Sequence, residues 1–373
     1  MTPRRDAREI EKRIGLVNEG RETAGQLVAV DQLPPLAITM GDPAGIGPEL
    51  CLRVVQEPSV LSCCLPVIVG DLEVLLRVAR TCDLSVPERV VMLREWNSRL
   101  LDGNTPIVLD CQAIDAGLLR PGEIQASCGR AAFEYIRVAI EKTIATDFAG
   151  LVTGPIHKQA LTRAHIPFPG HTEILATLTG ADQICMMLTS DVLSVSMVTS
   201  HTGFADVPGH LTPELIVNVI RLTSDFFKTL GNAAPRIGVC GLNPHSGEGG
   251  MLGRGEEAEF IEPAIAKARA EGMSVTGPLA PDTAFLPELM SRFDAIVCMY
   301  HDQGLIPFKM LAFDRGVHLT LGLPIIRTSV DHGTAFDIAW TGRASPRSMT
   351  EAILWAARLV PLKRKSGAVA AQS

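Results

Sequence analysis

The sequence is poor in aromatic residues and carries no excess of positive charge, and both shortages limit what it can bind. Phe, Trp and Tyr make up 5% of the 373 residues, and the formal net charge at pH 7 is −7. Proteins that bind nucleic acid usually present a basic surface, and those that bind single strands stack the bases on aromatic rings. We therefore expect no nucleic-acid partner.

The sequence also lacks cysteine pairs, a membrane-length apolar run and a secretory leader. The nine cysteines form no Cys-x-x-Cys pair, and buried free thiols are common in a reducing compartment, where disulfides are rare. No stretch reaches the roughly 18 apolar residues typical of a membrane-spanning helix. Residues 1–32 are charged and have no apolar core of the kind found in signal peptides. These features favour a cytoplasmic protein without a membrane partner.

Aliphatic residues, glycine and proline are plentiful, as in compact α/β proteins. Hydrophobic residues make up 46% of the chain, and its length predicts two domains. Short apolar runs alternate with longer segments of helical spacing, which predicts largely parallel sheets covered by helices. The predicted strands are Leu36–Met40, Leu65–Val69, Ile107–Leu109, Ala149–Val152, Val195–Val198, Ile237–Cys240, Ala295–Met299 and Leu319–Leu321. The predicted helices are Asp6–Val17, Ala126–Ala145, Pro213–Leu230, Glu256–Glu271 and Ser348–Leu359.

One pair of apolar runs breaks this alternation. Ile184–Leu188 and Val192–Val198 are separated only by Thr189-Ser190-Asp191, a spacing typical of a β-hairpin. We therefore expect one antiparallel addition to the otherwise parallel sheets.

A glycine-rich loop, residues 41–49, follows the first predicted strand. It does not match the dinucleotide-binding fingerprint, because Leu50 stands where a third glycine is needed. Pro48 predicts the start of a helix, since proline suits the first helical position. The carboxylates of Asp42 and Glu49 flank the loop at the end of a strand, which favours a functional loop over a plain turn.

Three histidines follow predicted strands closely. His201, His245 and His301 each come shortly after an apolar run, and ligands of open α/β sheets bind beyond the carboxyl ends of the strands. Three imidazoles and one open position form a set that is typical of catalytic metal sites. For any one of them the alternative is an ordinary structural histidine.

Two further groups have alternative interpretations. His171 and Thr172 lie in a loop rich in Pro and Gly before a helix: His171 is a substrate contact or a fourth metal ligand, and Thr172 a substrate contact or a simple helix N-cap. Lys309 and Arg327 suit an anionic substrate, or else form structural salt bridges with nearby aspartates. His318 taken alone is a partly buried polar residue.

The motifs resemble those of the 4-hydroxythreonine-4-phosphate dehydrogenase family over about 36–357. The resemblance rests on MGDPAGIGPE, TGPIHK, GHTE, GLNPHSGEGG, MYHDQG and IRTSVDHGTAFDIA in combination. It implies two α/β/α domains with a cleft between them, as in isocitrate and isopropylmalate dehydrogenases, and NAD or NADP bound without a classical Rossmann motif. It also implies a homodimer whose active sites lie at the interface.

The resemblance implies roles for individual residues. A divalent metal (Zn, Mg or Co) is expected on His201, His245 and His301. The implied substrate contacts are His171 and Thr172, with Lys309, His318 and Arg327 on the phosphate side. The candidates for proton transfer are Lys158, His157 and Asp282. For Asp282 the alternative is a residue that caps a turn or helix.

Two departures from the family pattern bear on the substrate. The family usually has Asn at the position of His318, and Thr202-Gly203-Phe204 differs from the usual more apolar continuation. Relatives act on 4-phospho-D-threonate or 4-phospho-D-erythronate, or on carboxylated cis-dihydrodiols, and the stretch Asp337–Gly342 is closer to the phosphothreonate type. The retained Lys309 and Arg327 favour a phosphorylated substrate. The non-enzyme alternative is a metal-dependent sensor of phosphorylated sugar acids.

The resembled fold predicts a chain that leaves its first domain and returns to it. The predicted division is a peripheral extension 1–35, a first domain 36–150 with about 320–362, a second domain 151–319 with the dimer interface, and a frayed tail 363–373.

Overall fold

The computed structural model describes residues 33–313 and 315–370, and contacts divide the chain into two compact units. We call residues 183–322 the continuous unit, and residues 33–182 together with 323–370 the divided unit. The predicted division changes domain at 150 and near 320, whereas contacts place the changes at 182 and 322. Residues 151–182 belong with the divided unit because their helices pack on helix α5.

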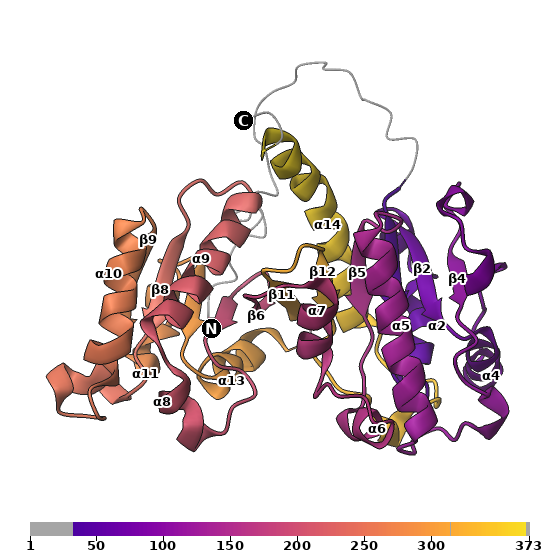
Figure 1. The fold of residues 1–373 in the computed structure, drawn as a ribbon, viewed down its shortest axis with the longest axis horizontal. Coiled ribbons are helices and arrows are strands. Elements are labelled where there is room, and N and C mark those ends of the chain that lie inside the picture. Colours follow the sequence, from indigo (N-terminus) through magenta and orange to yellow (C-terminus); the bar gives the residue numbers. More distant parts are fainter. Residues whose placement is uncertain (1–32, 314, 371–373) are drawn as a thin grey trace, which may run out of the picture. The chain divides into compact units, whose positions relative to one another are not determined.

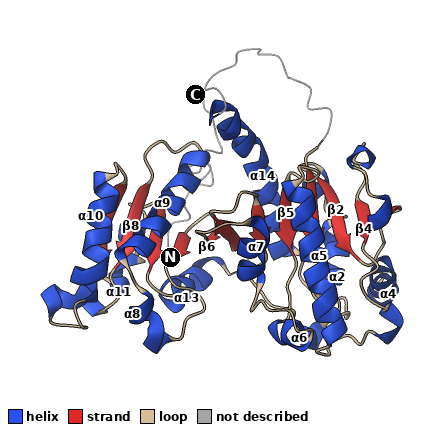
Figure 2. Cartoon of the chain, viewed as in Figure 1, coloured by secondary structure: helices blue, strands red, loops and turns tan. Residues whose placement is uncertain are grey.

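The divided unit contains six parallel strands in the order β3-β4-β2-β1-β5-β12 (Figures 1 and 2). Its inner strands are continuous apolar runs because both faces are buried. The strands are β1 (Pro35–Thr39), β2 (Leu65–Gly70), β3 (Arg89–Met92), β4 (Ile107–Asp110), β5 (Gly150–Thr153) and β12 (Arg327–Ser329). The helices are α2 (Gly47–Val54), α3 (Pro58–Leu61), α4 (Leu72–Cys82), α5 (Ala126–Ile144), α6 (Lys158–Arg163), α7 (His171–Thr179) and α14 (Arg347–Ala370).

The continuous unit contains six strands in the order β11-β6-β7-β10-β8-β9. The pairs β11–β6 and β6–β7 are antiparallel, and the remaining pairs are parallel. The strands are β6 (Cys185–Thr189), β7 (Ser194–Met197), β8 (Arg236–Cys240), β9 (Ser274–Leu279), β10 (Ala295–Cys298) and β11 (Val317–Leu321). The helices are α8 (Val207–His210), α9 (Pro213–Thr229), α10 (Glu262–Ala270), α11 (Pro281–Ala284), α12 (Pro287–Met290) and α13 (His301–Ala312).

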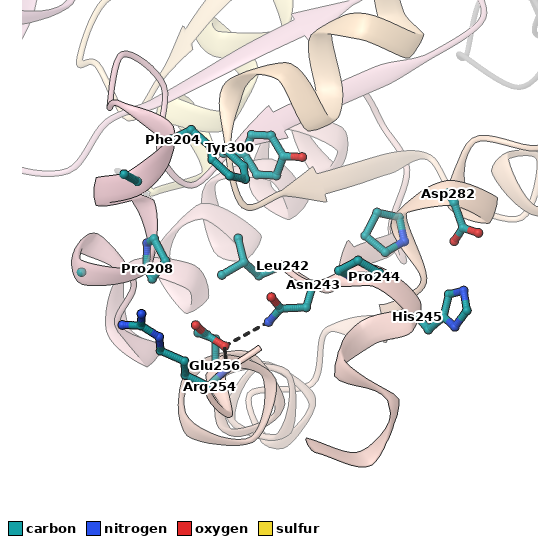
Figure 3. A pocket seen from close by; sticks show the side chains of 13 residues that line it. Phe204, Pro208, Leu242, Asn243, Pro244, His245, Arg254, Glu256, Asp282 and Tyr300 are labelled. Carbon is teal, nitrogen blue, oxygen red and sulfur yellow. Dashed lines mark hydrogen bonds between the residues drawn. The ribbon is translucent and has the colours of Figure 1, made fainter. Parts of the chain in front are cut away.

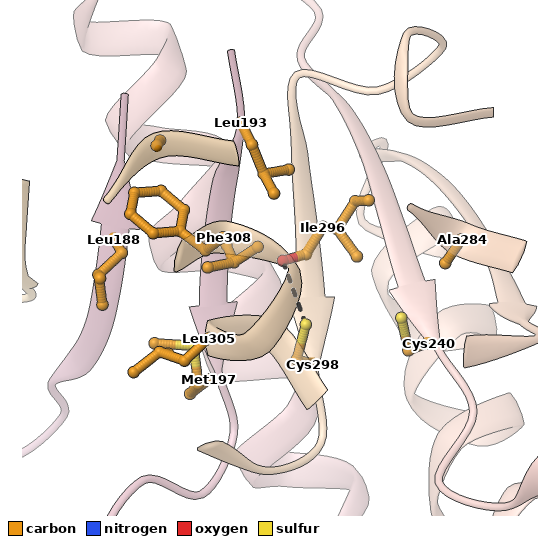
Figure 4. Close-up of a cluster of buried hydrophobic side chains, with 11 residues drawn as sticks. Leu188, Leu193, Met197, Cys240, Ala284, Ile296, Cys298, Leu305 and Phe308 are labelled. Carbon is orange, nitrogen blue, oxygen red and sulfur yellow. Dashed lines mark hydrogen bonds between the residues drawn. The ribbon is translucent and has the colours of Figure 1, made fainter. Parts of the chain in front are cut away.

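The core of the continuous unit lies between α13 and the strands (Figure 4). Phe308 of α13 is fully buried and belongs to one cluster with Ile296 of β10 and Met197 of β7. Burying such a side chain contributes about 1.5–3 kcal/mol. Since α13 begins directly after β10, this packing also fixes the position of His301, its first residue.

Most predicted elements are confirmed, including the antiparallel hairpin, in which Met186 pairs with Met197. The missed strands have weak apolar signals: β3 is only partly buried, β12 is the polar tripeptide Arg-Thr-Ser, and β9 contains Gly277-Pro278. The predicted helix 256–271 begins with a π-helical turn, η6 (Glu257–Ile261). The helix expected at 6–17 lies outside the described residues.

All nine cysteines are free, and six of them are buried. Within the described ranges, no helix combines the length and the apolar character that crossing a membrane requires.

Candidate active site

The three strand-end histidines belong to neighbouring strands of the continuous unit. His201 follows β7, His301 follows β10 and His245 follows β8. These strands are parallel and adjacent in the order β7-β10-β8. Parallel neighbours end at the same edge of a sheet, so the three loops leave the sheet together.

Hydrogen bonds tie these loops to one another. The backbone N–H and the hydroxyl of Thr199 both donate to the carbonyl of Met299, at 3.1 and 2.8 Å. The buried Gln303 amide accepts from the Met299 N–H at 2.7 Å and donates to the Gly241 carbonyl at 2.8 Å. Gln303 therefore joins the loop after β10 to the loop after β8. Sequence reasoning missed it, although its place two residues after His301 was a usable signal.

His201 and His301 lie beside each other, with ring centroids 6.0 Å apart. The Asp302 carboxylate is 2.6 Å from Nδ1 of His301. A carboxylate on one imidazole nitrogen orients the ring and makes the other nitrogen the ligating one, as is common for metal-bound histidines.

His245 lies apart from this pair, on the exposed turn η5 (Pro244–Gly250), with Nδ1 3.7 Å from a Glu248 carboxylate oxygen. Across the described residues, no three His, Cys, Asp or Glu side chains lie close enough to hold a metal ion. The structure thus brings two of the three proposed ligands together and places the third on the adjacent loop.

A cavity of about 790 Å³ lies within the continuous unit (Figure 3). The rings of Phe204 and Tyr300 form an edge-to-face pair on its lining, with centroids 5.4 Å apart. His245 and Asp282 lie together on one side, beyond Pro244. Asp282 is in the first turn of α11, whose N-cap is Ala280, so Asp282 does not cap this helix.

His171 and Arg327 lie in the divided unit. His171 is the first residue of α7, and its pKa lies well below the ordinary value because burial and the nearby charge of Arg327 disfavour protonation. The N-cap of α7 is Gly170, so of the two alternatives for Thr172 the structure excludes the simple helix N-cap. The helix starts earlier than expected because the extended backbone ends at Gly170, which leaves Thr172 inside the first turn.

Arg327 begins β12 and is 2% exposed. Its guanidinium donates to the hydroxyl of Thr153 at 2.6 Å. Burial lowers the pKa of Arg327, but a guanidinium stays charged at neutral pH. A planar guanidinium is chemically suited to hydrogen-bond an anion with two parallel N–H groups.

Two candidate proton-transfer groups are also in the divided unit. Lys158 begins α6 and passes beside Gly170, where a Cβ would lie 3.8 Å from the lysine Cε. His157 stacks on Phe336 with centroids 4.8 Å apart. Burial and the charge of Arg163 lower the pKa of His157, which favours its neutral form.

Lys309 and His318 belong to the continuous unit. Lys309 is on α13, with Nζ 6.0 Å from the centre of the Phe313 ring. His318 is on β11 opposite Leu188 of β6, and its Nε2 is buried.

The two carboxylates of the glycine-rich loop, Asp42 and Glu49, have different surroundings. Glu49 accepts hydrogen bonds from Arg53 and from the backbone N–H groups of Gly342 and Ala344, so it is a structural link to the chain beyond η7 (Phe336–Ile338). Asp42 is fully buried, and burial raises its pKa to about 6. One Asp42 oxygen accepts from the Ala44 N–H at 2.9 Å, and the other has no hydrogen-bond partner among the described residues.

The comparison with known families matches residues 62–356 to the pyridoxal phosphate biosynthetic protein PdxA family. The chain belongs to the PdxA family. The resemblance given by its motifs is therefore confirmed.

Relatives of this PdxA-family chain are similar over nearly their whole length. A 4-hydroxythreonine-4-phosphate dehydrogenase of Trichlorobacter lovleyi is 44% identical over 87% of this chain and 97% of its own. A D-threonate 4-phosphate dehydrogenase of Cupriavidus necator is 43% identical over 88% and 98%. The crystal structure of the 4-hydroxythreonine-4-phosphate dehydrogenase of Klebsiella pneumoniae superposes with a TM-score of 0.76, at 40% identity over 88% and 99% of the two chains. The expectation of a dehydrogenase is confirmed, as is a mixed α/β fold like that of PdxA structures.

Proposed function

We propose that this protein is a metal-dependent, NAD- or NADP-linked dehydrogenase that oxidises and decarboxylates a phosphorylated 3-hydroxy acid of the 4-hydroxythreonine-4-phosphate type. The observation that carries the proposal is the pairing of His201 with His301 at neighbouring strand ends, with Asp302 orienting the second ring. The named activities of the relatives support the same reaction class.

The donor chemistry suits a divalent cation. His201 and His301, with His245 from the adjacent loop, would hold Zn, Mg or Co, since imidazole is a common ligand of such metals. When bound, the ion supplies a positive charge that lowers the pKa of the substrate hydroxyl, and the nicotinamide cofactor supplies the hydride acceptor.

The cationic residues bind and orient the substrate. Arg327 meets the phosphate through its planar guanidinium, and Lys309 and His318 add contacts on the phosphate side. His171, which is neutral because its pKa is depressed, and Thr172 hold the end of the substrate near the reacting carbon. Contacts at both ends hold the substrate in one orientation, which lowers the entropic cost of reaching the transition state.

The proton transfers are assigned to Lys158 and Asp282. The stem of Lys158 passes beside Gly170, the residue before His171, and Asp282 and His245 both line the cavity of the continuous unit (Figure 3). Oxidation releases the hydroxyl proton and decarboxylation leaves an enolate that takes up a proton, so two groups suit the reaction.

The proposal includes a homodimer with its active sites at the interface and, for the divided and continuous units, a two-domain fold of the isocitrate dehydrogenase type. One observation supports the homodimer. Ile306 and Met310 of α13 and its C-cap residue Phe313 follow one another at helical spacing and are 59, 81 and 67% exposed. An apolar face of this kind is typical of a surface that another protein covers.

A panel of substrates tests the proposed function. It contains 4-phosphohydroxy-L-threonine, 4-phospho-D-threonate, 4-phospho-D-erythronate and a cis-dihydrodiol carboxylate, each with NAD⁺ or NADP⁺ and with or without divalent metal. We expect reduced-nicotinamide absorbance with a phosphorylated substrate only when metal is present. Binding without any nicotinamide reduction would favour the sensor, and turnover of the diol alone would overturn the phosphorylated substrate.

D-threonate 4-phosphate is the second candidate substrate. The D-threonate 4-phosphate dehydrogenase of C. necator is 43% identical to this chain, within one percentage point of the T. lovleyi enzyme. Overall identity therefore does not separate the two substrates, and the panel decides between them.

A further inference from the structure

The turn that carries His245 has an uncommon backbone conformation. Five successive residues, 245–249, have φ values of 52°, 54°, 78°, 43° and 68°. His245, Ser246 and Glu248 are not glycines, and in this left-handed region their Cβ atoms crowd the following carbonyl oxygen. A run of this kind persists only where its surroundings hold it, and such strain is concentrated at functional sites.

The carboxylate of Glu257 holds the start of this turn. One oxygen accepts from the backbone N–H groups of Leu242 and Asn243 at 2.9 and 2.8 Å, and the other accepts from the Asn243 amide at 3.0 Å. Glu257 is 4% exposed. The centre of the turn also lies against it, since a Cβ at Gly247 would be 2.7 Å from a Glu257 oxygen.

Glu256 hydrogen-bonds both ends of the loop 243–254. Its carboxylate accepts from the Arg254 N–H at 2.7 Å and from the Asn243 amide at 3.0 Å (Figure 3). Both glutamates stand at the start of η6, and a π-helical turn widens the helix and is frequent at functional sites. Two consecutive carboxylates thus converge on Asn243, two residues before His245.

We propose that Glu257 is a positioning residue for His245. By accepting hydrogen bonds from the N–H groups of Leu242 and Asn243, it imposes the left-handed turn and so sets where the His245 imidazole lies on the cavity lining. This inference rests on the proposed metal role of His245 and extends it, because Glu257 acts through the ligand and touches neither metal nor substrate.

A carboxylate suits this position better than an amide. The hydrogen-bond partners of Glu257 among residues 33–313 are all donors, and a carboxylate accepts hydrogen bonds at both oxygens. In Glu257→Gln the new NH₂ group would face the Asn243 amide donor. Rotating the Asn243 amide would let its oxygen accept from this NH₂ group, but the same oxygen would then face the Glu256 carboxylate. Neither orientation of the Asn243 amide therefore restores its hydrogen bonds to residues 256 and 257.

The test compares Glu257→Gln with Glu259→Gln in the full-length protein. Glu259 lies on the same turn but is exposed, so its variant removes the same charge without touching the loop. We expect Glu257→Gln to speed hydrogen exchange of the residue 242–250 amides at least tenfold, and to weaken Co²⁺ binding about 10–100-fold, as is typical when a residue behind a ligand is lost. Glu259→Gln should change neither, and both variants should keep the wild-type melting temperature within a few degrees.

A second variant covers the case in which Glu257→Gln fails to fold. Gly247→Ala places a methyl group against the Glu257 oxygen and disfavours φ of 78°, so it should shift exchange and Co²⁺ affinity in the same direction. Wild-type exchange and Co²⁺ affinity in either folded variant would overturn the proposal. A separate variant, His245→Ala, tests the proposed metal role of His245, which is wrong if this variant keeps wild-type Co²⁺ affinity. In that case hydrogen exchange in Glu257→Gln still shows whether Glu257 holds the turn.

Discussion

The two units differ in where key candidate residues stand: on exposed loops in the continuous unit, and inside the sheet in the divided unit. In the continuous unit, His201 and His245 are exposed and stand on loops, and the buried side chains of Gln303 and Glu257 hydrogen-bond the segment before His245. In the divided unit, Arg327 lies inside the sheet itself, 2% exposed, and the neighbouring His171 is kept neutral. A charge inside a sheet is oriented by the sheet before the ligand arrives, whereas an exposed residue on a loop depends on hydrogen bonds to that loop for its orientation.

The largest expected effect is on the histidine pair. His301→Ala should lower kcat about a thousandfold or more, because metal charge stabilisation contributes several kcal/mol and each 1.36 kcal/mol is tenfold in rate. The measurement is nicotinamide reduction with saturating metal and substrate, together with circular dichroism of the variant. His210→Ala is the matched control, because His210 is an exposed histidine of α8 whose ring hydrogen-bonds the Asp206 carbonyl of its own segment. Retention of metal-dependent turnover by His301→Ala would remove it from the site.

The next effect concerns stability in the divided unit. A pKa of about 6 for Asp42, in place of 3.8, corresponds to about 3 kcal/mol of cost for the ionised form in the folded protein. The folded state binds the proton more tightly, so this cost is present above pH 6 and disappears as the pH falls toward 3.8. Asp42→Asn keeps an acceptor for the Ala44 N–H, and should raise the free energy of unfolding at pH 8 by up to about 3 kcal/mol and by much less at pH 4.5.

Urea unfolding of wild type and Asp42→Asn at both pH values measures this difference. Asp115→Asn is the control, because Asp115 is exposed and likewise accepts from a backbone N–H two residues on. A variant that is equally destabilised at both pH values would show that the Asp42 carboxylate contributes to stability rather than costing it.

A smaller effect is expected when the buried positive charge of Arg327 is removed. Arg327→Met should raise KM for the phosphorylated substrate about thirtyfold, because a charge-assisted hydrogen bond is worth about 1.5–3 kcal/mol. KM for NAD(P)⁺ should change little. Arg99→Met removes an exposed arginine of the same unit and should leave both constants unchanged. An equal rise in KM for an unphosphorylated analogue would place Arg327 away from the phosphate.

The sequence predicted where the strands end, but it did not predict the hydrogen bonds that connect the loops after those strands. Apolar runs located β7, β8 and β10, and therefore the common edge of His201, His245 and His301, because the strands of a covered parallel sheet are continuously apolar. Hydrogen bonds between distant segments leave no such pattern. That Gln303 joins two loops, and that Glu49 is structural while Asp42 has an unpartnered oxygen, depend on chain segments that only the fold brings together.

The smallest expected effect is at His318 of β11. His318→Asn replaces a larger, titratable ring with a neutral amide that can still hydrogen-bond a phosphate oxygen. We expect less than a tenfold change in kcat/KM for any one substrate. The informative quantity is the ratio of kcat/KM for 4-phosphohydroxy-L-threonine to that for 4-phospho-D-threonate, measured at pH 6 and pH 8. If His318 selects the substrate by charge, the ratio changes with pH in wild type and becomes flat in the variant. If both proteins give the same ratio at both pH values, the substrate is selected elsewhere, and His318 differs from the divided unit's Arg327 in contributing packing on β11 rather than recognition.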